Sequence, residues 1–411
     1  MSIPIDRTLS PETRSEMLLE RYTATFKESP DKPFFLITVP LRVCPLGAHS
    51  DHQGGIVTGF TIDRSIQLLG RGIDTPEVSV VSANFDEHRS VDLGNIPPKT
   101  TGDWGNYVRG AAQALITKDG ELPRGFRGVL HGSMPIGGLS SSAAVTIAYL
   151  KALQHVNGLS SSNLETIMLV RAVENGYLGL HNGILDQSVI VSGKRGALTC
   201  IDCTAHTITS LDQGTSTVPW EILVVYSGLS RQLTATPFNQ RVAECHDAAR
   251  ELLRLAKRPV PEKPLLGEVD LEIFERYSSQ LPANLRRRAT HFFTERARVV
   301  GGMKLWSEGN IEGFGDLITA SGESSIHNYE SGSPALISLY EILAGISGVY
   351  GTRFCGGGFQ GCCLALIDPR KRDSIAEAVH AGYSTRHPEL IQDYSLHFCN
   401  STDSVSLEAL P

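Results

Sequence analysis

The stretch from Gly137 to Val156, GGLSSSAAVTIAYLKALQHV, is the feature that most constrains the fold. Two glycines and three serines precede apolar residues at helical spacing, so the sequence predicts a tight turn that leads into a buried helix. Such a junction exposes unpaired backbone N–H groups and the positive end of the helix dipole, and both favour a phosphate. A serine-capped helix after a tight loop would give the same residues. A Walker A loop is excluded because no G-K-[ST] follows the glycines.

Strand-like and helical segments share the 411 residues, a length that predicts two domains. Runs rich in β-branched and aromatic residues predict separate strands at FFLITVPLRV, IVTGFTI, SIQLLGRGI and EVSVVSA. Long amphipathic helices dominate from about residue 236, and the LRRRAT stretch within them is interpreted as a solvated helix face. We expect the domains to be 1–215 and 216–411.

The composition is that of an ordinary soluble globular protein, with 41% hydrophobic and 20% charged residues. The net charge of −7 argues against nucleic acid or an anionic membrane as a partner. The first residues lack the apolar core of a secretory signal, and no run of about 18 apolar residues occurs. We therefore expect a cytoplasmic protein. The sequence leaves its oligomeric state unknown.

The eight cysteines are scattered through apolar or small-residue surroundings, which is the pattern of free buried thiols. Cys200 and Cys203 form a C-x-x-C, but no second pair and no histidine pair stands at a zinc-like spacing. A strand end is therefore favoured there over a metal or redox site.

Three other motifs hold candidate functional residues. Glu174 and Asp186 lie around a glycine-punctuated loop in ENGYLGLHNGILDQS, and two carboxylates can divide metal binding and proton transfer between them. The glycines of CGGGFQGCC allow a backbone to approach a ligand or to turn sharply. PLGAHSDHQGG groups His49, Asp51 and His52. Taken alone, each motif is more simply explained by surface acids, a structural turn or a loop histidine.

Together, and in this order, the motifs resemble the GHMP family of small-molecule kinases. The matching elements are G-x-H-x-D-x-x-G-G, G-L-S-S-S-A and G-G-G-F-x-G-C, and the resemblance covers roughly residues 35 to 400. RVCPLGAHSDHQGG is similar to the galactokinase signature. PLGAHSDHQGG, ENGYLGLHNGILDQS, RVAEC, SSIHNYESG and GFQGCC together look most like galacturonokinases, the branch that phosphorylates C1 of D-galacturonate.

The resemblance implies an α+β fold of two domains, with the active site in the cleft between them. The N-terminal domain would be of the ribosomal S5 domain 2 type and the C-terminal domain ferredoxin-like. ATP and Mg²⁺ would be the cofactors, and a sugar acid the other substrate. Positioning and charge neutralisation carry most of such a phosphoryl transfer.

The resemblance also assigns roles to single residues. Asp186 would take the proton from the anomeric hydroxyl, with Arg42 beside it to keep it ionised. Ser142 and Glu174 would hold Mg²⁺. Trp104 would lie near the adenine, although a buried structural tryptophan is an equal alternative. The implied nucleotide-binding residues are Trp104, Gly137, Gly138, Leu139, Ser140, Ser141 and Ser142.

Ala48 stands where galactokinases carry a glutamate that faces the C6 hydroxyl of the sugar. Against a uronate, that glutamate would set two like charges about 4 Å apart. This costs on the order of 4 kcal/mol at an effective dielectric near 20, or roughly a thousandfold in affinity. Alanine removes the repulsion, and we expect Arg231 first and His52 second to attract the acid. The expected substrate-binding residues are Ala48, His49, Asp51, His52, Gly183, Arg231, Phe238 and Gly357.

Three departures from the family pattern leave alternatives open. The loop PIGGLSSSA is one residue shorter than usual, Phe238 replaces a tyrosine that reaches the sugar, and Gly357 stands in a loop that commonly reads G-A-G. The first alternative is a galactokinase or a broader hexose or hexuronate 1-kinase. The second is a non-catalytic sugar sensor. Mevalonate or homoserine phosphorylation is disfavoured, because RVCPLGAHSDH belongs to the sugar-1-kinase branch.

Overall fold

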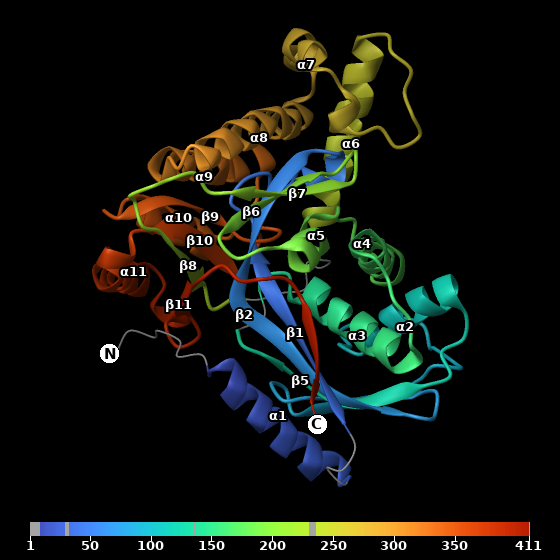
Figure 1. Cartoon of the computed structure of the whole chain (residues 1–411). Coiled ribbons are helices and arrows are strands. Elements are labelled where there is room, and N and C mark those ends of the chain that lie inside the picture. The colour runs from blue at the N-terminus through green and yellow to red at the C-terminus, as the bar shows by residue number, and fades with distance from the viewer. Residues whose placement is uncertain (1–8, 29–32, 135–136, 230–235, 411) are drawn as a thin grey trace.

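The computed structural model describes residues 9–28, 33–134, 137–229 and 236–410, which form two sheets joined by helices (Figure 1). The strands are β1 (Phe34–Val43), β2 (Ile56–Ile73), β3 (Glu77–Ser82), β4 (Glu87–Asp92), β5 (Gly125–Gly132), β6 (Ala197–Asp202), β7 (Thr207–Asp212), β8 (Glu221–Tyr226), β9 (Val349–Phe354), β10 (Cys362–Ile367), β11 (Ser395–Cys399) and β12 (Ser406–Leu410). The helices are α1 (Pro11–Phe26), α2 (Asn106–Asp119), α3 (Ser141–Asn157), α4 (Asn163–Arg171), α5 (Leu185–Ser192), α6 (Phe238–Leu255), α7 (Leu271–Tyr277), α8 (Ala283–Ser307), α9 (Ile311–Ser324), α10 (Pro334–Ala344) and α11 (Arg372–Arg386).

The larger sheet has eight strands, six of them in the order β12-β1-β2-β5-β3-β4. The β6–β7 hairpin attaches to the first half of β2, and among the described strands of this sheet only β3 and β5 pair in parallel. Helix α3 packs on one face of this sheet, against β1, β2 and β5. Helix α1 covers part of the other face, where Leu18 and Tyr22 meet Leu69 and Val129. The apolar run after the serines is thus the buried helix α3, as predicted.

The prediction of separate strands at IVTGFTI and SIQLLGRGI is wrong, because β2 runs without a break from Ile56 to Ile73. Its first residues pair with β6 and its last with β5. The polar residues at the expected turn find partners instead: Asp63 N–H donates to the carbonyl of Asn400, and Arg64 donates to that of Phe398. The strand therefore continues through a point that looks like a turn.

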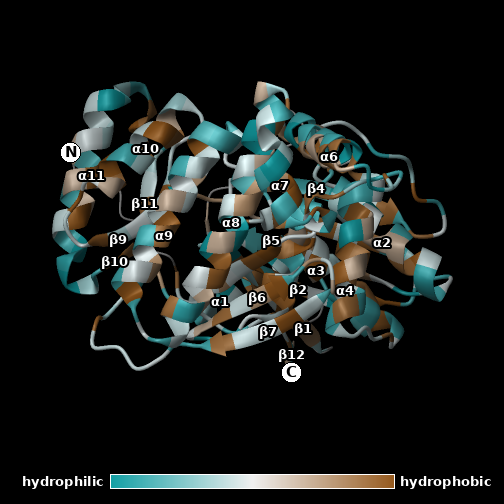
Figure 2. Cartoon of the chain, turned by 90° about the horizontal axis from the view of Figure 1, so that it is seen from above, coloured by the Kyte–Doolittle hydropathy of each residue, from teal (hydrophilic) through white to brown (hydrophobic). Residues whose placement is uncertain are grey.

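The smaller sheet is antiparallel, in the order β11-β8-β10-β9, and is covered by α10 and α11. Successive residues of β8 serve two cores, as the two-residue period of a strand requires. Ile222 and Val224 join the core of the larger sheet, whereas Leu223 and Val225 face the second core. Figure 2 shows hydrophobic residues concentrated on the central strands and hydrophilic ones on the outer helices. The shared core fixes the two sheets against each other.

The expected boundary near residue 215 falls between β7 of the larger sheet and β8 of the smaller one. The C-terminal strand β12 returns to the larger sheet and pairs with β1, so the two halves also share a strand. None of the helices in the described ranges is long and apolar enough to cross a membrane. All eight cysteines are buried and free, as expected.

The interpretation of LRRRAT as a solvated helix face is wrong for its last arginine. Arg288 is 1% exposed and lies inward on α8. It donates to Glu244 at 2.7 Å and to Glu330 at 2.6 Å, and also to the Asn328 carbonyl at 2.6 Å. These partners lie on distant elements, so the sequence around the triplet could not indicate them.

Candidate active site

Two glycine-rich loops meet backbone to backbone at the N-terminus of α3. Gly138 has φ +77°, and a Cβ there would lie 3.1 Å from the Cys362 nitrogen and 3.3 Å from the Cys355 oxygen. A Cβ on Gly361 would lie 2.8 Å from the Gly137 carbonyl carbon, and Cys362 Sγ donates to the Gly137 carbonyl at 3.1 Å. Side chains at Gly138 and Gly361 would separate these loops, which explains why both motifs carry glycine. GGLSSSAA and CGGGFQGCC thus build one surface.

Ser140 lies at the N-terminus of α3 without acting as an ordinary cap. It has left-handed dihedral angles, φ 61° and ψ 38°, and its side chain makes no capping hydrogen bond. Its buried Oγ has no partner among the described residues. Strained backbone and an unpaired buried hydroxyl are features that gather at ligand sites. They favour the phosphate interpretation of this motif over a plain serine-capped helix.

Arg42 of β1 and Asp186 in the first turn of α5 form a close ion pair. Arg42 Nε lies 2.8 Å from Asp186 Oδ1, and a terminal nitrogen lies 2.7 Å from the same oxygen. Burial opposes the charge of Arg42, but Asp186 beside it holds the pKa of the guanidinium above its ordinary value. Arg42 also donates to the Gly138 carbonyl at 3.2 Å. The pair therefore lies directly against the glycine-rich loop.

Glu174 is fully buried in the π-helical turn Ala172–Tyr177, which follows α4. Ser142 Oγ donates to one carboxyl oxygen at 3.4 Å, and Asn182 Nδ2 donates to the other at 2.7 Å. Burial and the nearby Asp186 raise the pKa of Glu174 to about 8. A buried carboxyl beside a hydroxyl is an oxygen donor set that suits Mg²⁺ and would be stabilised by it.

The turn Gly47–His52 follows β1 and places its polar residues beside α5 and α8. His49 has φ +62° and stacks on Tyr329 with ring centroids 3.9 Å apart. Its Nε2 is buried and has no partner among the described residues. Burial and the neighbouring His291 and Arg353 hold the pKa of His49 well below its ordinary value. A neutral imidazole with one unused nitrogen is suited to a hydrogen bond with a sugar hydroxyl.

Asp51 belongs to the same turn and faces the start of α5. Its carboxylate accepts the Leu185 N–H at 3.4 Å, and a Cβ on Gly183 would lie 2.6 Å from Asp51 Oδ2. Burial and the charge of Asp186 raise the pKa of Asp51 to about 6. Gly183 is therefore the residue that lets the loop before α5 approach Asp51.

Ala48 and His52 differ in how they face this site. Ala48 is 4% exposed and packs in the main core. His52 Nε2 lies 3.2 Å from Tyr329 Oη, and its Nδ1 lies 3.1 Å from Gln53 Nε2. Burial and two nearby histidines lower the pKa of His52 to about 3, so the ring is neutral. His52 therefore carries no positive charge that could attract a carboxylate.

The other expected site residues are placed less closely together. Trp104 Nε1 donates to Glu87 at 2.9 Å, and Arg89 lies over the indole ring. Phe238 begins α6, 6.0 Å from the His52 ring. Leu139 is buried in the core, although its carbonyl accepts the Arg42 N–H. Ser141 is the first residue of α3 and Gly357 lies in the loop after β9, whereas Arg231 lies outside the described residues.

Sequence reasoning missed Asn182, Tyr329, His291 and Glu295, which contact the site residues from behind. Asn182 and Tyr329 lie within motifs already singled out, and Tyr329 ends the π-helical turn Ser325–Tyr329. His291 and Glu295 are polar residues four apart on α8 and are fully buried. Polar residues at this spacing on an apolar helix face indicate that each has a polar partner in the fold. They do not indicate which residue the partner is.

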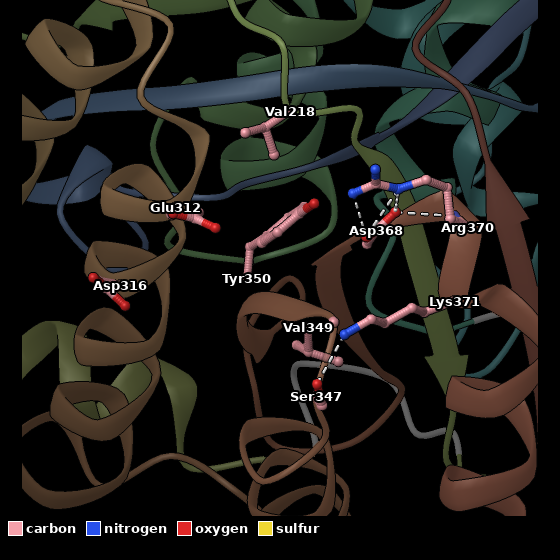
Figure 3. Close-up of a pocket in the computed structure, with 10 residues that line it drawn as sticks. Val218, Glu312, Asp316, Ser347, Val349, Tyr350, Asp368, Arg370 and Lys371 are labelled. Carbon is pink, nitrogen blue, oxygen red and sulfur yellow. Dashed lines mark hydrogen bonds and ion pairs between the residues drawn. The ribbon is translucent and has the colours of Figure 1, made fainter.

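A separate pocket lies at the other end of the smaller sheet, where β9 begins and β10 ends (Figure 3). Its basic groups already have partners: Arg370 contacts Asp368 at 2.8 Å, and Lys371 donates to Ser347 at 2.9 Å. None of its lining residues belongs to the Arg42–Asp186 site. This pocket is therefore not part of the candidate active site.

Comparison with known proteins gives matches over most of the chain. Residues 106–194 match the family described as GHMP kinases N terminal domain, and residues 303–385 match GHMP kinases C terminal. The chain is 42% identical over 373 residues to a galacturonokinase of Arabidopsis thaliana, covering 86% of this chain and 88% of the relative. It is 30% identical to a galactokinase of Chloroflexus aggregans, covering 88% and 90% of the two chains.

Among solved structures, the chain is similar to Lactococcus lactis galactokinase complexed with galactose. The TM-score is 0.86 at 27% identity, and the match covers 96% of this chain and 99% of the other.

Proposed function

Because this chain belongs to the GHMP kinase family and is a sugar-1-kinase, we propose that it transfers a phosphoryl group from ATP to the C1 hydroxyl of D-galacturonate. The products would be D-galacturonate 1-phosphate and ADP. The relative with 42% identity is a galacturonokinase, and those near 30% are galactokinases. We further propose that residues 1–215 form an S5 domain 2-like unit and residues 216–411 a ferredoxin-like one.

The observation that carries the choice of substrate is Ala48. By the family resemblance this position faces C6 of the sugar, and its side chain carries no charge. Asp51 already lies close by, with Asp186 next to it. A further carboxylate at position 48 would repel the C6 carboxylate of a uronate, whereas alanine leaves room for it.

Asp186 is the proposed base. Two nitrogens of Arg42 hold its side chain in place, and a carboxylate oxygen of Asp186 would accept the proton of the C1 hydroxyl. Arg42 also links this carboxylate to the Gly138 carbonyl, so the base and the glycine-rich loop keep a fixed distance. That geometry suits a reaction in which hydroxyl and phosphate must meet in line.

Ser142 and Glu174 are the proposed ligands of Mg²⁺, and the N-terminus of α3 is the proposed phosphate site. The ion would neutralise phosphate charge when bound. Ser140 would donate its unpaired hydroxyl to a phosphate oxygen, and backbone N–H groups of the first turn would add further donors. Asn182 would hold the Glu174 carboxylate in place through its 2.7 Å hydrogen bond.

The test is a panel of initial rates with ATP and Mg²⁺ on galacturonate, glucuronate, galactose and glucose. We expect the highest kcat/KM with galacturonate, and loss of sugar-dependent ATP consumption in Asp186→Asn, which keeps the shape of the side chain. A higher kcat/KM with galactose would overturn the proposed substrate in favour of a galactokinase. A protein that binds sugar without consuming ATP would be a sensor instead.

A further inference from the structure

The turn that carries Ala48 and His49 is held from behind by helix α8. His291 Nε2 lies 3.0 Å from the Ala48 carbonyl oxygen, and Glu295 accepts the Gly47 N–H at 2.7 Å. Residues four apart share one face of a helix, so both contacts come from the same side of α8. His291 and Glu295 are each 0% exposed. The contacts therefore lie inside the protein and are not exposed to water.

The hydrogen-bond partners of His291 determine which ring nitrogen carries the proton. A carbonyl only accepts, so Nε2 must donate to Ala48, and Nδ1 is left as an acceptor. Ser324 Oγ lies 3.0 Å from Nδ1 and donates to it, while Asn328 Nδ2 donates to Ser324 Oγ at 3.1 Å. Burial lowers the pKa of His291 to about 4, which keeps the ring neutral with its single proton on Nε2. This chain of donors thus ends at Ala48.

Glu295 is the second anchor of the turn. Besides the Gly47 N–H it binds Arg298 at 2.7 Å, Arg353 at 3.4 Å and Ser321 Oγ at 2.5 Å. Arg353 and Glu295 are both fully buried. Breaking a buried ion pair is strongly destabilising because it leaves an unpaired charge. Glu295 is therefore a poor residue to change in an experiment, whereas the neutral His291 can be replaced without exposing a charge.

The strain at His49 connects these anchors to the sugar site. A non-glycine residue in the left-handed region persists only where its surroundings fix it. His49 has φ +62° and stacks on Tyr329, and the residue before it is bound through its carbonyl to His291. The unpaired Nε2 of His49 therefore owes its direction to contacts that lie behind the turn.

We propose that His291 is a positioning residue for the sugar: its hydrogen bond to the Ala48 carbonyl sets the orientation of His49 and Asp51. This inference rests on the proposed function, because it takes Gly47–His52 as the sugar-binding turn. His291 itself does not touch the substrate. It acts through the backbone of residue 48, so its effect falls on sugar binding and not on the nucleotide loop at Gly138.

The test compares three variants. His291→Phe keeps a ring but removes the donor, and His291→Gln keeps an amide N–H that can reach the carbonyl. The control is His380→Phe, which removes an imidazole of α11 that pairs with Tyr394. We expect His291→Phe to raise the sugar KM about tenfold, as loss of one hydrogen bond implies, with the KM for ATP unchanged. His291→Gln should recover most of the affinity, and His380→Phe should leave both KM values unchanged.

An unchanged sugar KM in folded His291→Phe would overturn the inference, and so would an equal rise of both KM values or a failure of His291→Gln to recover affinity. If His291→Phe does not fold, Ser324→Ala removes the donor to Nδ1 and should raise the sugar KM by a smaller factor. An unchanged sugar KM in folded Ser324→Ala would then overturn the inference. The measurement uses the sugar with the highest kcat/KM in the panel. A wrong assignment of galacturonate would therefore show in the panel itself, while the split between the two KM values still tests His291.

Discussion

The buried carboxyl of Glu174 makes the metal-free protein sensitive to pH. Burial and Asp186 raise its pKa from 4.5 to about 8. The folded protein therefore keeps the Glu174 proton over a range in which the unfolded chain has lost it. This contribution to stability is fully present below pH 4.5 and is lost as the pH rises to about 8, where the folded protein also releases the proton.

The size of the effect follows from the two pKa values, since one unit corresponds to about 1.4 kcal/mol. At pH 7 the loss is on the order of 3 kcal/mol, and above pH 8 it reaches on the order of 5 kcal/mol. Glu174→Gln has the same shape and no ionisation. We therefore expect the free energy of unfolding of Glu174→Gln to rise relative to that of the wild type as the pH increases from 5 to 8, following these values. The variant should also lose kinase activity.

Urea denaturation of the EDTA-treated proteins from pH 5 to pH 8.5 measures this difference. Glu272→Gln, an exposed position on α7, is the matched control and should follow the wild type. Added Mg²⁺ should stabilise the wild type at pH 8 but not Glu174→Gln, because an ion stabilises only the protein that binds it. Wild-type and Glu174→Gln curves that stay parallel across the pH range would refute the reasoning.

Three further predictions concern single contacts in the site. Ala48→Glu should raise the galacturonate KM by up to roughly a thousandfold. Ala48→Gln has the same bulk and no charge and should raise this KM by no more than about tenfold, so equal effects of the two variants would contradict repulsion between charges as the cause. Arg42→Lys keeps the charge but loses the two-nitrogen contact to Asp186, so kcat should fall by about 10²-fold, and a kcat within twofold of wild type would contradict this. Gly138→Ala should raise the KM for ATP about tenfold, because φ is +77° and the added Cβ would contact the neighbouring loop. The control is Gly102→Ala, where φ is +78° and no atom lies within 4 Å of the added Cβ, and it should leave the KM for ATP unchanged.

The local pattern was sufficient for most single elements. Serines before an apolar run predicted the start of α3, and runs rich in β-branched and aromatic residues predicted β1 and β3. Periodicity reports only on residues close in sequence, so it could not join the two halves of β2 or pair β12 with β1. Those features depend on which backbone groups of distant residues remain to be satisfied.

The candidate site was reached through ordered motifs and not through spacing. Arg42 and Asp186 lie 144 residues apart, and only the resemblance placed them side by side. The role of His291 could not be predicted from the sequence, because its partner is a backbone carbonyl, which any residue at position 48 would supply. A contact made to the backbone places no requirement on the side chain of the partner residue, so the sequence does not indicate it. A turn can thus be recognised from sequence while the residues that hold it are not.

Charge links Ala48 to the proposed metal. Burial and the charge of Asp186 raise the pKa of both Asp51 and Glu174, so three carboxyl groups already interact in the site before any substrate enters. The positive charge of Arg42 is already paired with Asp186, at 2.7 Å. A triphosphate and a uronate would bring still more negative charge to these groups. Binding both therefore requires added positive charge at the phosphates, which Mg²⁺ and the N-terminus of α3 supply, and no further carboxylate at the sugar. A glutamate at position 48 would be compatible with a neutral hexose but not with a uronate, so the residue that stands there should decide which sugar the same catalytic pair can phosphorylate.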